Sequence, residues 1–264
     1  MKRKLEGFFD LPTKKVRLSQ GEVDLPIFYS DYGYAHFLFW ADYPKVVPKL
    51  EGTGFTPCKF FGAKAAVLLN FFEYRQTAIG PYNEVGLSIL CYAKTLKNPG
   101  MFLPQLLRDA MHWRVGAYVI NLPVTSEIAY LAGKEIWSYP KFVTPISVDL
   151  KGRQFRGQVE DPRLHKPIFE LAGTIGWLGP GLSNSSASFI SHTTHQGKPL
   201  RILTEVDARF KANLGFRGRL AVNEQSEHDM AANLLDMGLQ DKRPIFTMYC
   251  PKARMILHEG VPIE

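Results

Sequence analysis

The stretch Ser126-Glu-Ile-Ala-Tyr-Leu-Ala-Gly-Lys-Glu-Ile-Trp-Ser-Tyr-Pro-Lys-Phe142 joins a predicted helix to a predicted strand. Ser126 is a good N-cap residue, and Glu127 suits the positive end of a helix dipole. Apolar side chains then recur at helical spacing. Pro140 cannot continue a helix, and the β-branched and aromatic residues that follow it favour a strand. The pattern therefore places Lys141 at a helix-to-strand junction.

Lys141 is the candidate reactive group of this stretch. Its neighbours Trp137, Tyr139, Pro140 and Phe142 are bulky and mostly apolar. An amine held among such side chains is partly removed from water, which disfavours the charged ammonium form and leaves a nucleophile for carbonyl compounds. The alternative is that the lysine extends its ammonium group past the apolar neighbours into solvent. The residues alone leave both interpretations open.

Composition predicts a globular protein with a basic N-terminal arm. The chain has 264 residues and 45% hydrophobic content, and its net charge of +7 comes from 32 Lys and Arg against 25 Asp and Glu. Part of the excess lies in Lys2-Arg-Lys4 and Lys14-Lys-Val-Arg17. Residues 1–25 are predicted to form this arm, either flexible or in contact with another subunit, and residues 26–264 one domain. Basic clusters can bind nucleic acid, but no nucleic-acid-binding motif follows, so a solvated arm and no nucleic-acid partner are predicted.

Cysteine usage and hydropathy predict a cytoplasmic protein. Cys58, Cys91 and Cys250 lack the spacing of a disulfide framework or a zinc site, so buried reduced thiols are expected. No stretch of about 18 uninterrupted apolar residues occurs, which predicts no membrane association. The histidines also lack metal-ligand spacing, so no metal is predicted.

Strand patterns dominate the remainder of the chain. Helical patterns are fewer, and Gly176–Ser188 reads as a loop. Many strands with few helices indicate an antiparallel, β-rich α+β fold whose strands close into a barrel or cone with a few outer helices. The predicted strands are 35–40, 65–74, 85–92, 116–122, 142–150, 153–160, 167–175, 200–207 and 244–257, and the predicted helical segments are 42–48, 102–113, 126–137 and 226–239.

A second candidate residue, Glu84, follows the tight turn Gly80-Pro-Tyr-Asn and opens an apolar strand. A carboxylate at this position either faces a pocket or marks a solvent-facing strand start.

Together, Gly80-Pro-Tyr-Asn-Glu84 and Ala132-Gly-Lys-Glu-Ile-Trp-Ser-Tyr-Pro-Lys141 resemble motifs of the acetoacetate decarboxylase family, in the right order and at about the right separation. The likeness covers roughly residues 25–260. It implies a barrel or cone of strands, a homo-oligomer, and a pocket lysine that forms a Schiff base with a ketone without any cofactor. In that family the lysine is activated by removal from water or by a neighbouring cation, and this mechanism is taken here from the resemblance.

The resemblance assigns catalytic roles to Lys141, as the Schiff-base lysine, and to Glu84, which would transfer protons or orient the substrate. Two features differ from the family pattern. Phe142 stands where the decarboxylases place a second lysine, and 28–34 lacks the arginine suited to a substrate carboxylate. The family pattern also has a second pocket glutamate on the strand before the turn, and its position falls near Leu69 or Asn70 in this chain. The predicted substrate-binding residues are Tyr82, Trp137, Tyr139, Phe142 and Tyr249.

The sequence therefore predicts a Schiff-base lyase that acts on a small-molecule keto substrate, with a β-keto acid decarboxylase as the first choice. Because the second lysine and the arginine are missing, two alternatives stay open. One is an aldolase or dehydratase acting on a larger keto substrate. The other is a member of the family that binds a carbonyl ligand without turnover.

Overall fold

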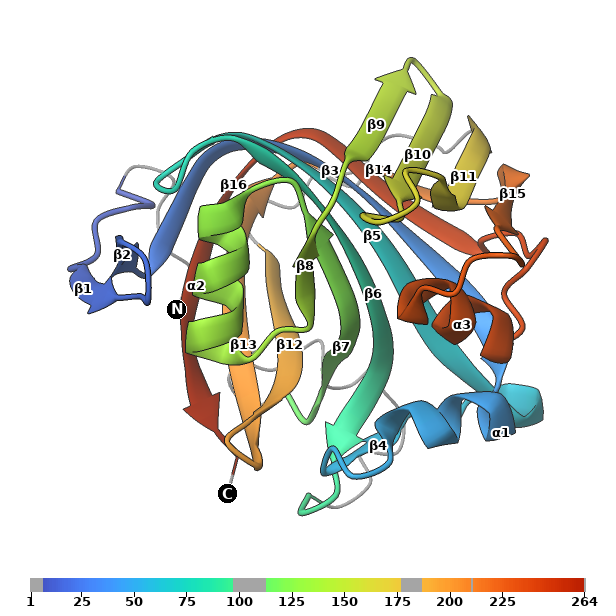
Figure 1. The fold of residues 1–264 in the computed structure, drawn as a ribbon, viewed down its shortest axis with the longest axis horizontal. Helices are drawn as coiled ribbons and strands as arrows, with labels where there is room; N and C mark the ends of the chain where they lie inside the picture. Colours follow the sequence, from blue (N-terminus) through green and yellow to red (C-terminus); the bar gives the residue numbers. More distant parts are fainter. Residues whose placement is uncertain (1–6, 97–112, 177–186, 210, 264) are drawn as a thin grey trace.

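The fold is a closed β-barrel with a second sheet packed against one side (Figure 1). The computed structural model describes residues 7–96, 113–176, 187–209 and 211–263. Within these residues, seven strands close into a ring, and all neighbours in it are antiparallel except the parallel pair β12 and β7. Around the ring they are β6 (Tyr82–Ala93), β5 (Lys64–Thr77), β3 (Ile27–Asp42), β16 (Phe246–Pro262), β13 (Lys198–Ala208), β12 (Ala187–His195) and β7 (Val115–Val124). The predicted β-rich α+β barrel is confirmed.

A separate antiparallel sheet covers part of the outer surface of the barrel (Figure 1). Alternate residues of a strand face opposite sides, so Phe37 and Phe71 point away from the barrel interior and towards this sheet. The ring of Phe37 lies 4.7 Å from that of Phe155. A Cβ atom at Gly157 would lie 2.3 Å from the Phe71 ring, so only glycine permits this close approach. In order, the sheet contains β15 (Phe216–Val222), β11 (Pro167–Ile175), β10 (Gln154–Glu160) and β9 (Ile146–Lys151).

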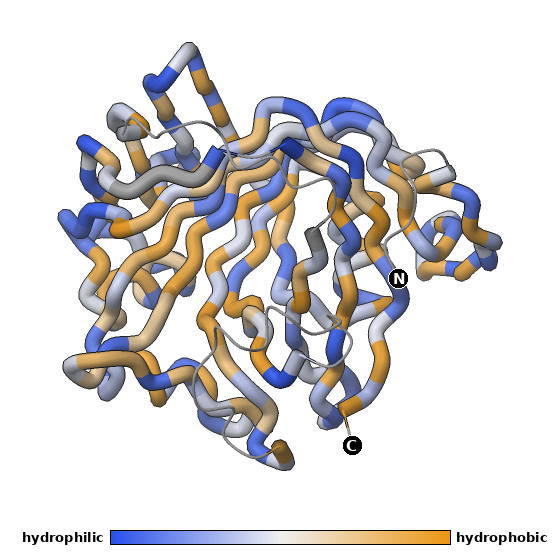
Figure 2. The backbone as a smooth tube through the Cα atoms, turned by 180° about the vertical axis from the view of Figure 1, so that it is seen from behind, coloured by the Kyte–Doolittle hydropathy of each residue, from blue (hydrophilic) through white to orange (hydrophobic). Residues whose placement is uncertain are grey.

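The two faces of the long barrel strands are therefore buried in different ways. The outer face packs into the core beneath the second sheet, and the inner face borders the barrel interior. Figure 2 shows hydrophobic residues distributed along these strands, as expected where both faces are removed from solvent.

The helix predicted at the lysine-containing stretch is present as α2 (Glu127–Trp137). The side-chain oxygen of Ser126 accepts a hydrogen bond from the backbone N–H of Ala129, which caps the first turn. Ser138 ends the helix in the left-handed conformation with φ 54°. The chain then enters β8 (Lys141–Val143), which pairs in parallel with β7. The junction has the predicted form.

The other predicted elements are present with shifted ends. The strand predicted at 142–150 is divided into β8 and β9, and the helix predicted at 226–239 is the shorter α3 (Asp229–Asp236). The helix predicted at 102–113 and most of the loop at 176–188 lie outside the described residues. The remaining short elements are α1 (Tyr43–Val46), η1 (Val47–Leu50), β4 (Phe55–Pro57), η2 (Phe61–Ala63) and β14 (Lys211–Leu214).

A hairpin of β1 (Lys14–Arg17) and β2 (Glu22–Leu25) occupies part of the segment predicted as a basic arm. It lies on the side of the barrel away from the second sheet (Figure 1). Leu18 and Leu25 are buried, and Ser19 donates hydrogen bonds from its backbone N–H and its hydroxyl to the carboxylate of Glu135. The basic side chains of the hairpin point to solvent, whereas its apolar ones pack on the barrel. The division of the chain at residue 25 stays a prediction.

The three cysteines are free and buried, as predicted. Among the helices of the described residues, none combines the length and hydrophobicity that crossing a membrane requires.

Candidate active site

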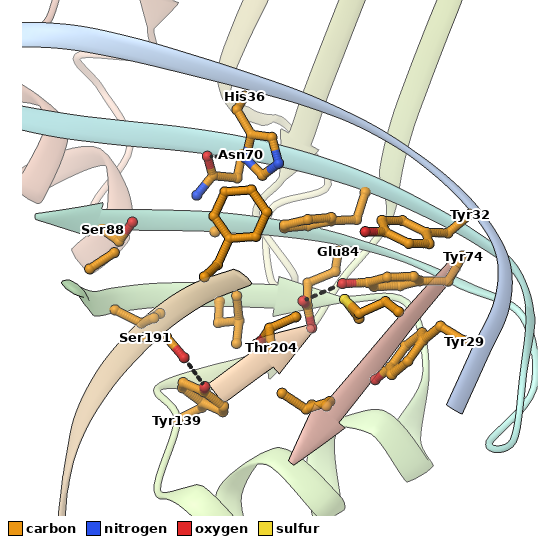
Figure 3. A pocket seen from close by; sticks show the side chains of 18 of the residues that line it. Tyr29, Tyr32, His36, Asn70, Tyr74, Glu84, Ser88, Tyr139, Ser191 and Thr204 are labelled. Atoms are coloured by element: carbon orange, nitrogen blue, oxygen red, sulfur yellow. Dashed lines mark hydrogen bonds between the residues drawn. The ribbon is translucent and has the colours of Figure 1, made fainter. Parts of the chain in front are cut away.

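The barrel encloses a cavity of about 260 Å³. Its lining comes mainly from the inward-facing residues of the barrel strands, together with residues of α2 and β8. Most of these side chains are aliphatic or aromatic, and a small number of polar groups converge among them (Figure 3). Among the described residues that line the cavity, Lys141 and Glu84 are the ones with an acidic or strongly basic side chain. A mostly apolar cavity with few polar groups is typical of a small-molecule site.

The local fold brings the side chain of Lys141 into this cavity. The backbone N–H of Leu122 donates to the carbonyl of Pro140 over 3.1 Å, which starts the pairing of β8 with β7. The aliphatic part of the lysine then passes directly over Gly133 of α2. A Cβ atom at Gly133 would lie 2.3 Å from Cε of Lys141. The glycine of the Ala132-Gly motif therefore makes room for the lysine side chain.

Lys141 and Glu84 form a buried ion pair. The lysine Nζ lies 2.6 Å from Oε2 of Glu84, and the two side chains are 7% and 10% exposed. Glu84 is on β6, so the two residues come from different strands and lie 57 positions apart in the sequence. The pocket-facing interpretation of Glu84 is the one that the geometry supports. For Lys141, the geometry supports the interpretation of a buried amine, because the amine is held inside the barrel and does not extend into solvent.

Buried tyrosines surround the carboxylate end of this pair. The hydroxyl of Tyr74 donates to Oε1 of Glu84 over 3.3 Å, and the ring of Tyr82 lies 5.8 Å from Nζ of Lys141. The hydroxyls of Tyr29 and Tyr82 are hydrogen-bonded at 3.0 Å. Burial raises the pKa of all three phenols, and the nearby Glu84 carboxylate raises them further. These phenols therefore stay protonated and can donate hydrogen bonds at neutral pH.

Three of the five predicted substrate-binding residues line the cavity, namely Tyr82, Trp137 and Tyr139. The hydroxyl of Tyr139 is hydrogen-bonded to that of Ser191 at 2.6 Å. Trp137 donates from Nε1 to the carbonyl of His258 over 3.2 Å. These contacts fix the orientation of the two aromatic rings beside Lys141.

Phe142 and Tyr249 are not among the residues that line this cavity, so their predicted placement in the substrate site is corrected. Successive strand residues face opposite sides. Because Lys141 points inward, Phe142 points outward, where its ring lies 4.5 Å from that of His228. In the same way Met248 lines the cavity, and Tyr249 lines a separate hollow beneath the second sheet.

Sequence reasoning missed several polar groups of the cavity, in particular His36 on β3 and Ser88 on β6. His36 Nδ1 lies 2.7 Å from Oδ1 of Asn70. Burial inside the barrel lowers the pKa of His36 to about 4, so its imidazole is neutral and its Nδ1–H donates to the amide oxygen. Of the two positions where a second glutamate was expected, Asn70 faces the cavity and Leu69 packs in the outer core.

No three His, Cys, Asp or Glu side chains gather as metal ligands anywhere in the part of the chain that the structure describes.

The family model for acetoacetate decarboxylase matches residues 36–196, a segment that contains both Glu84 and Lys141. No curated protein sequence gives a significant match. A solved acetoacetate decarboxylase has a TM-score of 0.59 at 16% identity, with 93% of this chain and 91% of that chain covered. The acetoacetate decarboxylase from Legionella pneumophila subsp. pneumophila has a TM-score of 0.58 at 13% identity, with 90% and 87% covered.

Another similar structure is that of the enduracididine biosynthesis enzyme MppR in complex with the condensation product of pyruvate and imidazole 4-carboxaldehyde. Its TM-score is 0.54 at 14% identity, and 90% of this chain and 88% of that chain are covered. At such low identities these structures are similar to the chain in fold. The family model matches more than half of the residues, and the chain belongs to the acetoacetate decarboxylase family.

Proposed function

We propose that this protein is a lyase in which Lys141 forms a Schiff base with a small keto substrate. The observation that supports this most strongly is the position of Lys141. Its Nζ lies 2.6 Å from Oε2 of Glu84, and both side chains are buried in the wall of a mostly apolar cavity. A lysine beside a carboxylate can lose its proton to that carboxylate without any change in the net charge of the pair. The products of this transfer are a neutral amine, which is a nucleophile, and a carboxylic acid, which is a proton donor.

The steps of Schiff-base formation follow from this pair. The neutral amine of Lys141 attacks the carbonyl carbon of the substrate, and the new C–N bond gives a carbinolamine. The acid form of Glu84 protonates the departing hydroxyl, which leaves as water. The product is a protonated imine on Lys141, and the carboxylate of Glu84 is again beside a positive charge. The protonated imine then accepts the electron pair of a bond that breaks at the neighbouring carbon.

Decarboxylation of a β-keto acid is the first candidate for that bond cleavage, because the family is named for it. The bond to the carboxylate breaks, CO2 leaves, and the electron pair passes to the imine to form an enamine. Protonation of the enamine carbon and hydrolysis then release the ketone and Lys141. A cavity with few polar groups assists this step, since a carboxylate that is removed from water is destabilised relative to CO2.

Retro-aldol or dehydration chemistry is the second candidate, favoured by the charges of the cavity. Apart from Lys141, the described lining residues supply no cation that would hold a substrate carboxylate. In a retro-aldol step, the carboxylate of Glu84 takes the proton of a β-hydroxyl group, the C–C bond breaks, and an aldehyde leaves with formation of the enamine. The structurally similar MppR was solved with a condensation product of pyruvate and an aldehyde.

Borohydride trapping tests the proposal. The protein is incubated with acetone, acetoacetate or a β-hydroxy ketone, reduced with borohydride, digested and analysed by mass spectrometry. We expect a reduced adduct on the peptide that contains Lys141, and we expect Lys141→Met to lose it. Lys134→Met, which removes an exposed lysine of α2, is the matched control and should keep the adduct.

The absence of an adduct on Lys141 with all of these ketones would overturn the proposal. It would favour the alternative of a protein that binds carbonyl compounds without reacting, for which Lys141→Ala should leave ligand affinity unchanged. The products distinguish the two reactions, because acetoacetate turnover releases CO2 and retro-aldol cleavage of the β-hydroxy ketone releases an aldehyde.

A further inference from the structure

The hydroxyl of Ser88 is buried in the wall of the cavity and makes no hydrogen bond to any described residue. Ser88 is 2% exposed. A buried hydroxyl without a partner is uncommon in folded proteins, because it has lost its hydrogen bonds to water without replacement. Because Ser88 is among the residues that line the cavity, a molecule bound there is the candidate partner once the hydroxyl turns towards it.

Ser88 lies far from the reactive pair on the same strand. Glu84, Gly86 and Ser88 are alternate residues of β6, and all three face the cavity. Four residues of an extended strand span about 13 Å. Figure 3 shows Ser88, Asn70 and His36 towards one side of the cavity, and Glu84 with Tyr32, Tyr74 and Tyr29 towards the other. The cavity is thus long enough to contact two separate parts of one ligand.

The wall between the two ends leaves room for an apolar chain. Gly86 has no side chain, and a Cβ atom there would lie 3.4 Å from a methyl carbon of Leu122 and 3.7 Å from Nδ2 of Asn70. These distances are ordinary van der Waals contacts, so the strand itself does not require glycine. A larger side chain at this position would project between the two ends. Elsewhere the cavity lining includes the apolar side chains of Phe72, Phe189 and Met248.

The polar groups at the Ser88 end are suited to an uncharged oxygen. Asn70 pairs with Gly86 across β5 and β6, next to the pairing of Leu68 with Ser88. Since the oxygen of the Asn70 amide accepts from His36, its NH2 group is the part left to donate to a ligand. A carboxylate would find only neutral groups among the described residues at this end, and would be buried without a counter-ion.

We propose that the cavity binds a keto compound with two separated polar groups. The carbonyl lies at Lys141, an apolar chain of several carbons runs past Gly86, and a hydroxyl or second carbonyl oxygen at the far end is held by Ser88 and Asn70. This rests on the proposed function in that it places the reacting carbonyl at Lys141. It names a class of larger substrates whose far end is uncharged, for which acetoacetate is too short.

Two ligand series test this substrate class. One is a set of straight-chain methyl ketones of increasing length, and the other is the same set with a terminal hydroxyl. Affinities are measured by calorimetry with Lys141→Met, in which no Schiff base can form, and apparent affinities by borohydride trapping on the natural protein. At one chain length, we expect the hydroxyketone to bind roughly fivefold to tenfold more tightly than the plain ketone, as one hydrogen bond allows.

Variants of the far end identify the contact. Ser88→Ala should reduce the affinity for the hydroxyketone to that for the plain ketone, and Gly86→Leu should exclude the long ketones. Ser147→Ala, which changes an exposed serine of β9, is the matched control and should keep the preference.

Equal affinities for the two series at every length, or a preference that persists in Ser88→Ala, would overturn this inference. A preference seen by calorimetry without trapping on Lys141 would overturn the proposed function alone. Trapping without a preference would leave the function and overturn the substrate class, in which case the Ser88 hydroxyl binds water only.

Discussion

At the scale of single residues, the ion pair of Lys141 and Glu84 is the feature on which the proposed chemistry depends. Two opposite charges removed from water stabilise one another, and the loss of either one leaves the other without compensation. The side chains are 7% and 10% exposed, so solvent screens this pair far less than it screens the salt bridges on the surface. The pair therefore affects both stability and reactivity.

Glu84→Gln should lower the free energy of unfolding by about 3 kcal/mol, because the ammonium group of Lys141 is then buried without its carboxylate. Replacing both residues, in Lys141→Met with Glu84→Gln, should restore most of that loss. Urea denaturation at pH 7 measures both changes. If the loss in the double variant equalled the sum of the losses in Glu84→Gln and Lys141→Met, the two side chains would not be coupled.

His192 makes the stability of the folded protein depend on pH. Its side chain is 0% exposed, and burial, followed by the nearby charge of Arg201, lowers its pKa to about 3 from 6.5. The unfolded chain therefore takes up a proton between pH 6.5 and 3 that the folded chain does not, and stability falls as the pH is lowered through this window. This residue should account for about 2 kcal/mol of the loss between pH 7 and 5.

The contribution of His192 is measured by urea denaturation at pH 7 and pH 5 of the natural protein and of His192→Gln. The loss of stability between the two pH values in the variant is subtracted from that in the natural protein. The loss of stability at pH 5 should be smaller in the variant by the stated amount. An identical pH dependence of stability in the two proteins would mean that the pKa of His192 is the same in the folded and unfolded states.

At the scale of secondary structure elements, α2 and β8 act together to position the reactive amine. The helix ends at Ser138, and the next residues turn the chain so that β8 pairs with β7 and Lys141 passes over Gly133. Glycine is a poor residue for a helix interior, so its presence in α2 calls for a reason. The space that Lys141 occupies supplies one.

Gly133→Ala should leave α2 folded, since alanine is the better helix former by about 1 kcal/mol. The added methyl group would overlap the side chain of Lys141, which has to move. We expect a large loss of borohydride trapping on Lys141, with a thermal stability no lower than that of Glu84→Gln, because the displaced lysine loses its carboxylate partner while the helix gains a better residue. Lys134→Ala, at the exposed neighbouring position, should keep normal trapping. Unchanged trapping in Gly133→Ala would show that the lysine reaches its position by another path.

Local patterns predicted α2, its cap and its end because those signals are contained in a few neighbouring residues. The inward direction of Glu84 and the outward direction of Phe142 and Tyr249 depend instead on the strand register, which a one-residue shift reverses. Ser88 and His36 could not be predicted as site residues, because they reach the same cavity only when the barrel closes. The strand β12 was missed since its residues are mostly polar, although its central place in the barrel buries His192 and Thr193.

At the scale of the whole molecule, the second sheet and the N-terminal hairpin cover different sides of the barrel. Homo-oligomerisation, which the family resemblance implies, stays a prediction, and so does the separation of residues 1–25 from the domain.

Deletion of residues 1–20 tests that separation. It removes Leu18 from its buried position, and it removes Ser19 from its contact with α2. We expect a loss of about 2 kcal/mol in the free energy of unfolding, as for one buried leucine. Replacing Lys14, Lys15 and Arg17 by glutamine is the matched control, and it should change stability little because these side chains are exposed. Equal stability of the deleted and full-length proteins would support an independent arm.

The crystal structure of the protein after borohydride reduction with a terminally hydroxylated methyl ketone tests the central claim most directly. We expect continuous density from Nζ of Lys141 to the former carbonyl carbon of the ligand, with Glu84 beside the new secondary amine and the ligand chain directed past Gly86 towards Ser88. An unmodified Lys141, with the ligand bound elsewhere or absent from the barrel, would contradict the account.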